Sequence, residues 1–146
     1  MTADTIFSLG NLIALTGWAA LLAALFVDRV RTGALAWAGW VLPLLLGLAY
    51  AALIAAGREG FGQGGFGSIA EVRALFADDW ALTAGWFHYL AFDLFVGSAI
   101  VREGRERGVS PWLVLPALPL TFLLGPVGLL VWAAIRTIAV PRKGGA

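Results

Sequence analysis

WALTAGWFHYLAFDLFVGSAIV, residues 80–101, is a run of mostly apolar side chains that is long enough to cross a bilayer. As a helix it would rise about 33 Å, close to the thickness of the hydrocarbon core. His88 and Asp93 lie inside the run, and His88 is the only histidine of the chain. The run therefore predicts a membrane-spanning helix that carries two ionisable side chains near mid-membrane.

The composition of the whole chain points to the same class of protein. Of the 146 residues, 60% are hydrophobic and 13% are charged, with a mean hydropathy of +0.87. Soluble domains are nearer half apolar and a quarter charged, so we expect an integral membrane protein with a single domain, residues 1–146. The net charge of +1 argues against a nucleic-acid partner. The absence of cysteine excludes disulfides, thiolate metal sites and thiol nucleophiles.

Three further apolar runs have a comparable length, so we predict an all-α fold, a four-transmembrane-helix bundle. The expected spans are residues 6–27, 35–56, 80–101 and 112–135. Residues 57–67 are rich in glycine and predict a flexible connector between the second and third spans. Ser68 and Glu71 then have the spacing of a capping box before an amphipathic stretch. That pattern predicts a short interfacial helix over residues 68–78.

The orientation of such a bundle depends on where its basic residues lie. With four spans, each membrane surface carries five lysine or arginine residues, so the positive-inside count is tied. Arg29 and Arg31 directly follow the first span, whereas no basic residue precedes it. This local asymmetry favours both termini outside the cytoplasm.

His88 and Asp93 need either a partner or a function, because an ionisable group in a bilayer costs several kcal/mol. Their separation of five residues places them about 140° apart around a helix, so we expect them to face different neighbouring helices. Tyr89 and Asp93, four residues apart, share one face. One interpretation is structural: His88 bonds a neighbouring backbone or hydroxyl group. Asp93 then bonds one of three polar residues on other helices, namely Asn11, Thr16 or Thr121.

The other interpretation is a ligand pocket between helices, because aromatic side chains, among them Trp86 and Phe92, surround the two ionisable residues. Several kinds of cofactor site are excluded. The only lysine, Lys143, lies outside every predicted span, which excludes a retinal Schiff base. A single histidine cannot build a histidine-rich di-iron centre, and no zinc-ligand cluster is present. We therefore expect no metal and no resident cofactor.

The carboxy-terminal part of the sequence resembles a known family. Residues 85–132, which contain HYLAFDLFVG and TFLLGPVGLL, closely resemble the abscisic-acid-deficient-four-like family, whose plant member is called neoxanthin synthase. The earlier stretches TIFSLGNLIAL and VRALFADDWALTAGW are also similar to its pattern. The resemblance implies a small membrane protein that acts on a carotenoid, since the plant members are required to convert violaxanthin to neoxanthin. Because those plant members carry a transit peptide and this chain begins without one, we expect it in a bacterial inner or intracytoplasmic membrane.

If that reaction carries over, the resemblance implies a cofactor-independent isomerisation of an epoxide to an allene. His88 would be the acid–base group, and Asp93 would set its charge or stabilise the developing cation. Tyr89 and Asn11 would orient a ring hydroxyl of the ligand. The remaining candidate ligand-binding residues are Trp86, Phe92 and Thr121.

A second function remains open from the sequence. The protein would then be a non-catalytic accessory subunit that holds a carotenoid or packs at the edge of a larger membrane pigment or respiratory complex. Residues 68–79 would suit docking in such a complex. The expected partners are membrane lipid, a carotenoid or other isoprenoid, and either a larger complex or further copies of the chain.

Overall fold

The described part of the chain is entirely helical. A computed structural model describes residues 2–57 and 64–139, and these residues contain no strand. The elements are α1 (Ala3–Phe26), α2 (Asp28–Ala36), the π-helix η1 (Trp37–Val41), α3 (Leu42–Ala56), α4 (Ile69–Leu75), α5 (Asp79–Glu106), α6 (Pro111–Val114), α7 (Ala117–Leu124) and α8 (Pro126–Ala139). Most of the glycine-rich connector expected over 57–67, residues 58–63, lies outside the described residues. The all-α prediction is confirmed.

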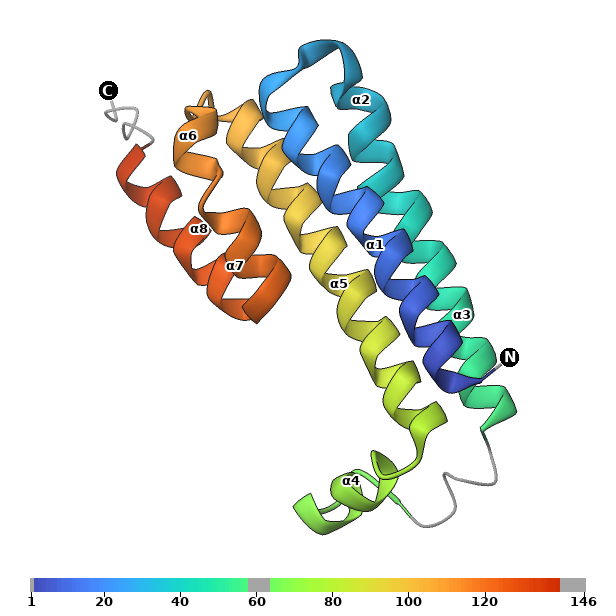
Figure 1. The fold of residues 1–146 in the computed structure, drawn as a ribbon. Helices are drawn as coiled ribbons and strands as arrows, with labels where there is room; N and C mark the ends of the chain where they lie inside the picture. Colours follow the sequence, from blue (N-terminus) through green and yellow to red (C-terminus); the bar gives the residue numbers. More distant parts are fainter. Residues whose placement is uncertain (1, 58–63, 140–146) are drawn as a thin grey trace.

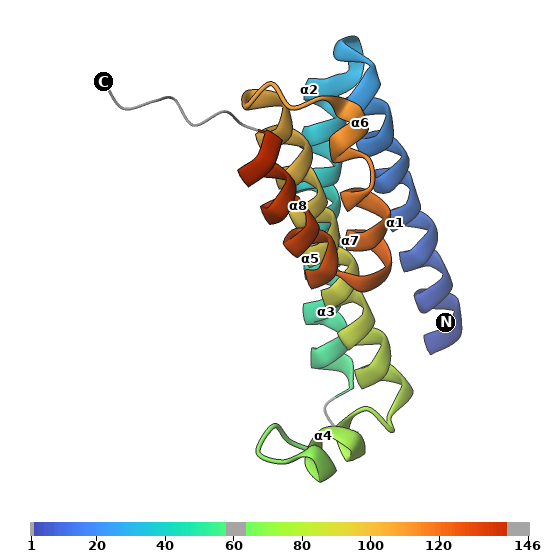
Figure 2. The ribbon, with the colours of Figure 1, turned by 90° about the vertical axis from the view of Figure 1, so that its left-hand side faces the viewer.

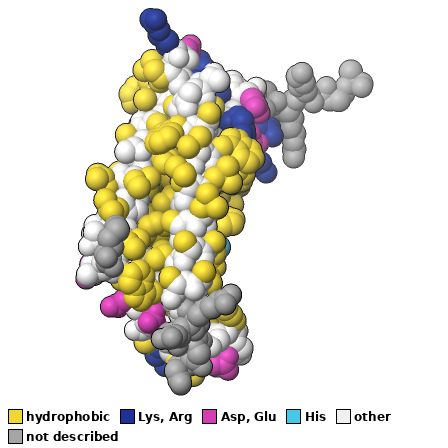
Figure 3. Space-filling view, turned by 90° about the vertical axis from the view of Figure 1, so that its right-hand side faces the viewer, with side chains coloured by type: hydrophobic (Ala, Val, Ile, Leu, Met, Phe, Trp, Pro, Cys, Tyr) yellow, Lys and Arg dark blue, Asp and Glu magenta, His cyan; other side chains and the backbone are white. Residues whose placement is uncertain are grey.

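Within residues 2–57 and 64–139, three helices are long and apolar enough to cross a membrane: α1, the continuous helix Asp28–Ala56 and α5. They lie side by side along most of their length, with α5 in contact with both others (Figure 1). Apolar side chains cover the face formed by α1 and α3, and charged side chains gather towards its two ends (Figure 3). The chain is therefore a membrane protein, and its first three spans were predicted in the correct places.

The connection between the first two spans is shorter than the sequence suggested. Residues 28–34, expected as a loop, belong to α2, and only Val27, with φ −118° and ψ 101°, interrupts the helix. Farther along, Pro43 has no N–H to donate and its ring would collide with the carbonyl of Gly39 in an α-helix. The π-helical turn at 37–41 accommodates this proline, and the Leu42 N–H bonds to the Trp37 carbonyl, five residues back.

The predicted fourth span, residues 112–135, is not confirmed, because no single helix covers it in the described part of the chain. The chain from Pro111 to Leu124 descends beside α5, turns back at Gly125 and ascends again as α8, so that α7 and α8 form an antiparallel hairpin (Figures 1 and 2). Gly125 has φ +46° and ψ −96°, a conformation that is open to glycine and strained for other residues. Pro126 then begins α8, at the one helical position where its missing N–H costs nothing.

The hairpin changes the position of the carboxy-terminal end. Among the described residues, α1 begins at one end of the bundle, and the antiparallel α7–α8 hairpin brings the end of α8 to the other (Figure 1). The expectation that both termini lie on the same side is therefore not supported. Helices that cross only half of a membrane are tolerated where their terminal backbone N–H and C=O groups form hydrogen bonds inside the protein and do not face lipid.

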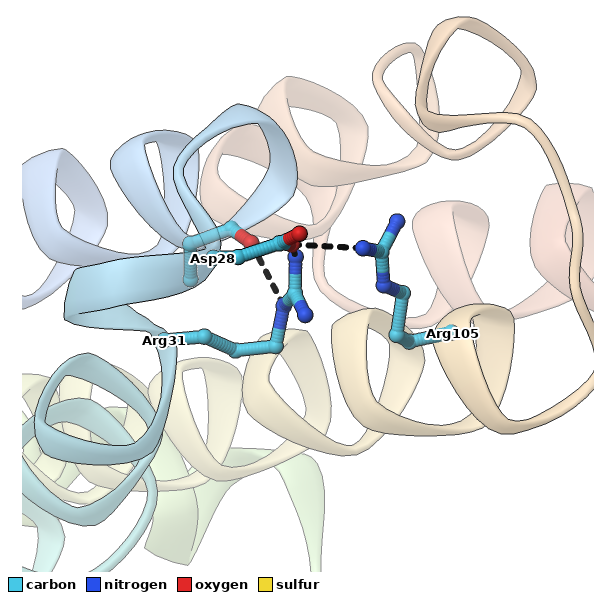
Figure 4. A network of polar contacts seen from close by, with 4 residues as sticks. Asp28, Arg31 and Arg105 are labelled. Carbon is cyan, nitrogen blue, oxygen red and sulfur yellow. Dashed lines mark hydrogen bonds and ion pairs between the residues drawn. The ribbon is translucent and has the colours of Figure 1, made fainter.

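Charged side chains connect the α1–α2 corner at residues 26–28 and the α7–α8 hairpin to the carboxy-terminal end of α5. Asp28 accepts hydrogen bonds from Arg31 and from Arg105 of α5, the latter at 2.5 Å (Figure 4). Glu103 accepts from Trp132 Nε1 of α8 at 2.7 Å and from Arg136 at 3.1 Å. These two carboxylates place the α1–α2 corner, α5 and α8 at one common end of the bundle.

At the opposite end, residues 64–78 form a small unit, the cap segment. The Ser68 hydroxyl accepts from the Glu71 N–H at 3.2 Å, as the capping-box spacing predicts, and Glu71 Oε2 accepts from the Gly67 N–H at 3.0 Å. The helix expected over 68–78 is shorter, Ile69–Leu75. Asp78 caps α5, and its carboxylate accepts from the N–H groups of Trp80 and Ala81.

Candidate functional site

A single groove brings the ionisable residues of the membrane interior together. It has a volume of about 500 Å³ and is lined almost entirely by apolar side chains. Its walls come from α3, the cap segment, α5 and the turn between α7 and α8. The lining residues are Tyr50, Ile54, Phe66, Leu75, Phe76, Ala81, Ala84, Gly85, His88, Tyr89, Phe92, Asp93, Val96, Gly125, Pro126 and Leu129.

The groove occupies the half of α5 that the hairpin leaves uncovered. Its lining along α5 runs from Ala81 to Val96, about 22 Å of helix. The α7–α8 turn bounds the groove near the middle of α5, and the cap segment bounds it at the opposite end (Figure 1). A complete fourth span would fill this space. The re-entrant turn at Gly125 therefore creates the groove.

His88 faces α3 within the groove. Its ring lies 5.9 Å from the ring of Tyr50, measured between centroids, and stacks on Phe92 at 4.6 Å with an interplanar angle of 28°. The ring of Tyr89 meets it edge-on at 6.3 Å. Both imidazole nitrogens are thus left for a ligand, since the side-chain hydrogen bonds within residues 2–57 and 64–139 do not include His88.

Asp93 faces the hairpin turn. A Cβ placed on Gly125 would lie 2.9 Å from Asp93 Oδ1, so the glycine allows the carboxyl group to lie against the turn. Asp93 is half-buried and, like His88, takes part in no side-chain hydrogen bond among the described residues. The two residues face different elements, as their spacing predicts, yet both line the same groove.

Polar residues suggested as structural partners of Asp93 are bonded elsewhere. Asn11 accepts from Trp86 Nε1 at 2.9 Å and donates to the Phe7 carbonyl. The Thr16 hydroxyl donates to the Ile13 carbonyl at 2.7 Å. Thr121 is fully buried between α7 and α8, where its hydroxyl donates to the Ala117 carbonyl at 2.8 Å.

Other predicted ligand-binding residues divide into two groups. Tyr89 and Phe92 line the groove beside His88 and Asp93. Asn11, Trp86 and Thr121 do not line it: the first two pair with each other across α1 and α5, and the third lies within the hairpin.

Sequence reasoning missed the parts of the groove that other elements contribute. Tyr50, one of only two tyrosines, comes from α3, and no local pattern connects it with His88. Gly125-Pro126 is a dipeptide typical of a turn, and in an apolar run it was the available sign of a break. Phe66, Leu75 and Phe76 reach the groove from the cap segment.

The groove opens towards the surrounding bilayer. Tyr89 and Phe92 line it and remain 60% and 59% exposed, as surface residues of a span that would contact lipid. Leu129 borders it from α8 and is 47% exposed. A lipophilic molecule dissolved in the membrane can therefore reach His88 and Asp93 without passing through water.

Comparisons with known proteins identify a family. A family model described as ABA DEFICIENT 4-like matches residues 5–132. No curated protein and no solved structure matches the chain.

Proposed function

The chain belongs to the ABA DEFICIENT 4-like family, and from this premise we propose that its groove binds a carotenoid or related isoprenoid and isomerises it. One observation carries the proposal: His88 and Asp93, the ionisable residues of the third span, line one apolar groove that is open to lipid. Polar groups gathered in an otherwise apolar pocket are the usual sign of a binding or catalytic site.

The reaction type in question requires only proton transfer. In the opening of a ring epoxide to an allenic alcohol, one C–O bond breaks and the oxygen gains a proton. A vinylic carbon loses a proton, and its C–H electrons become the new double bond. The product is an isomer of the substrate, so neither an oxidant nor a reductant is consumed.

Two groups suffice for this chemistry, and the groove offers both. His88, the only histidine of the chain, serves as the acid–base group. Asp93, about 7.5 Å farther along α5, stabilises the positive charge that develops as the epoxide opens. The ring of Phe92 stacks on the imidazole and the ring of Tyr50 lies 5.9 Å from it, so aromatic groups border the reacting centre.

We expect His88→Ala and Asp93→Asn each to lower the conversion of an epoxy-carotenoid at least about a hundredfold, the usual contribution of one acid–base group. The measurement is pigment analysis of a bacterial host that makes the epoxy-carotenoid and expresses the chain alone. Thr137→Ala, at the far end of α8, is the matched control and should convert normally. Full conversion by His88→Ala would show that His88 is not the acid–base group of the reaction.

The same experiment separates catalysis from an accessory role. An isomerase forms product when it is the only added protein. An accessory subunit forms none in this host, and after mild solubilisation of its native membrane it elutes within a large particle. The second result would replace the isomerase proposal by the subunit interpretation.

The hairpin also supports a proposal for the orientation of the chain in the membrane. Because Arg136 pairs with Glu103, it joins the end of the bundle that carries the arginines of α2 and the last turns of α5. Among the described residues, that end holds Arg29, Arg31, Arg102, Arg105, Arg107 and Arg136, and the other end holds Arg73. The positive-inside rule then places the arginine-rich end in the cytoplasm and the start of α1 outside.

We expect reporter fusions to the two termini to report opposite sides of the membrane. Alkaline phosphatase should be active at the amino terminus and inactive at the carboxy terminus, and a cytoplasmic fluorescent reporter should give the reverse. A fusion inserted within residues 58–63 should match the amino-terminal one. Equal behaviour of the two termini would indicate an even number of complete spans and contradict the re-entrant hairpin.

A further inference from the structure

Polar and apolar side chains along the groove follow an order opposite to that of a lipid leaflet. Asp93 lies at the middle of α5, about 21 Å from either helix end, and so near the bilayer midplane. Phe66, Leu75 and Phe76 line the groove at the cap segment, beside the membrane surface. A phospholipid instead has its polar headgroup at the surface and the methyl end of its chain at the midplane.

The reversed order makes the groove unfavourable for the acyl chains of the lipids that surround the protein. An acyl chain in the groove would press its terminal methyl group against the Asp93 carboxyl group. That carboxyl group would lose contact with any polar molecule, and no side chain among the described residues bonds it in compensation. An unpaired polar group buried by hydrocarbon is unfavourable whether it is charged or protonated.

We infer that Asp93 makes the groove reject ordinary lipid chains and select a lipophilic molecule that carries an oxygen to the bilayer midplane. A ring hydroxyl or ring ether would meet the Asp93 carboxyl group, and the apolar remainder would lie along α5 towards Phe76. The inference rests on the proposed function for the identity of the site. It adds a reason why the groove stays available in a membrane that offers a vast excess of lipid chains.

The direct test counts lipids that remain bound. The full chain is reconstituted in vesicles of phosphatidylethanolamine and phosphatidylglycerol, extracted in mild detergent and analysed by native mass spectrometry. The fraction of particles that retain a phospholipid should rise at least about tenfold in Asp93→Leu. Asp93→Asn, whose amide also needs a partner, should still exclude lipid. Thr137→Leu makes the same kind of polar-to-leucine change outside the groove and should resemble the wild type.

A second measurement uses ligands and does not depend on the leucine variant alone. When β-carotene and its 5,6-epoxide are offered together in the same vesicles, the wild type should retain the epoxide about tenfold more than the hydrocarbon. Asp93→Leu should show no such preference, and Thr137→Leu should keep it. Equal lipid retention by the wild type and Asp93→Leu, or equal retention of the two polyenes by the wild type, would overturn the inference.

These results are distinguishable from a failure of the proposed function. If the epoxide is selected but never isomerised, the inference stands and the isomerase proposal fails. If the epoxide is isomerised but the wild type retains phospholipid as often as Asp93→Leu, the inference fails and the isomerase proposal stands.

Discussion

Gly128→Ala should destabilise the protein by about 3 kcal/mol, at the upper end of the usual effect of overpacking. A methyl group on residue 128 would overlap the hydroxyl oxygen and the backbone nitrogen of Thr121 and approach its Cα to 2.6 Å. Thr121 is fully buried between the two helices of the hairpin. Backbone atoms cannot rotate away as a flexible side chain does, so α7 and α8 must separate.

The measurement is thermal unfolding in detergent, together with hydrogen exchange of peptides from α7 and α8. Exchange should increase in these helices and remain slow in the middle of α1 and α5. Gly47→Ala is the matched control, because nothing lies within 4 Å of its added Cβ and it lies inside α3. This control should be neutral or gain up to about 1 kcal/mol, since alanine is the better helix former.

Gly128→Ala also discriminates between the hairpin and a continuous fourth span. In one straight helix, residues 121 and 128 would be about 10.5 Å apart along the axis, and a methyl group on residue 128 could not touch Thr121. A variant as stable as Gly47→Ala would therefore argue for a single span over 112–135. Strong destabilisation is expected only if the chain reverses between the two residues.

Sequence patterns predicted the spans well because helix length and hydropathy are local properties. The runs within α1, α3 and α5 were correctly identified, and Ser68 and Glu71 located the helix of the cap segment. The same criterion did not locate the break within residues 112–135, because an apolar run of suitable length does not record a reversal in direction. The chain reverses at Gly125, where φ is positive. In the sequence, the local indication of this turn is the dipeptide Gly125-Pro126.

For the candidate site, the sequence supplied the residues on α5 but not their surroundings. His88, Tyr89, Phe92 and Asp93 were identified because polar and aromatic residues are conspicuous in a predicted span. Tyr50 was missed because its proximity to His88 depends on how α3 packs against α5. Asn11 and Trp86 were chosen for their chemistry, but they bond each other outside the groove. Such pairings depend on contacts between distant segments, which a single sequence does not specify.

Gly125→Ala should impair the site as well as the fold. The backbone conformation at residue 125, with φ +46° and ψ −96°, is strained for alanine, and such strain costs about 1–3 kcal/mol. In addition, the new Cβ would lie 2.9 Å from Asp93 Oδ1 and push the carboxyl group away from the turn. We therefore expect lower thermal stability and a loss of the epoxide preference of about tenfold, similar to the loss in Asp93→Leu.

A double-mutant cycle separates the two causes. In an Asp93→Ala background the carboxyl group is absent, so Gly125→Ala should cost only the backbone strain. The difference between its cost in the wild type and in this background is the coupling energy of the two residues, expected at about 0.5–3 kcal/mol for groups in contact. A coupling energy of zero would mean that Asp93 does not lie against the turn. The hairpin would then shape the groove without positioning the group that selects the ligand.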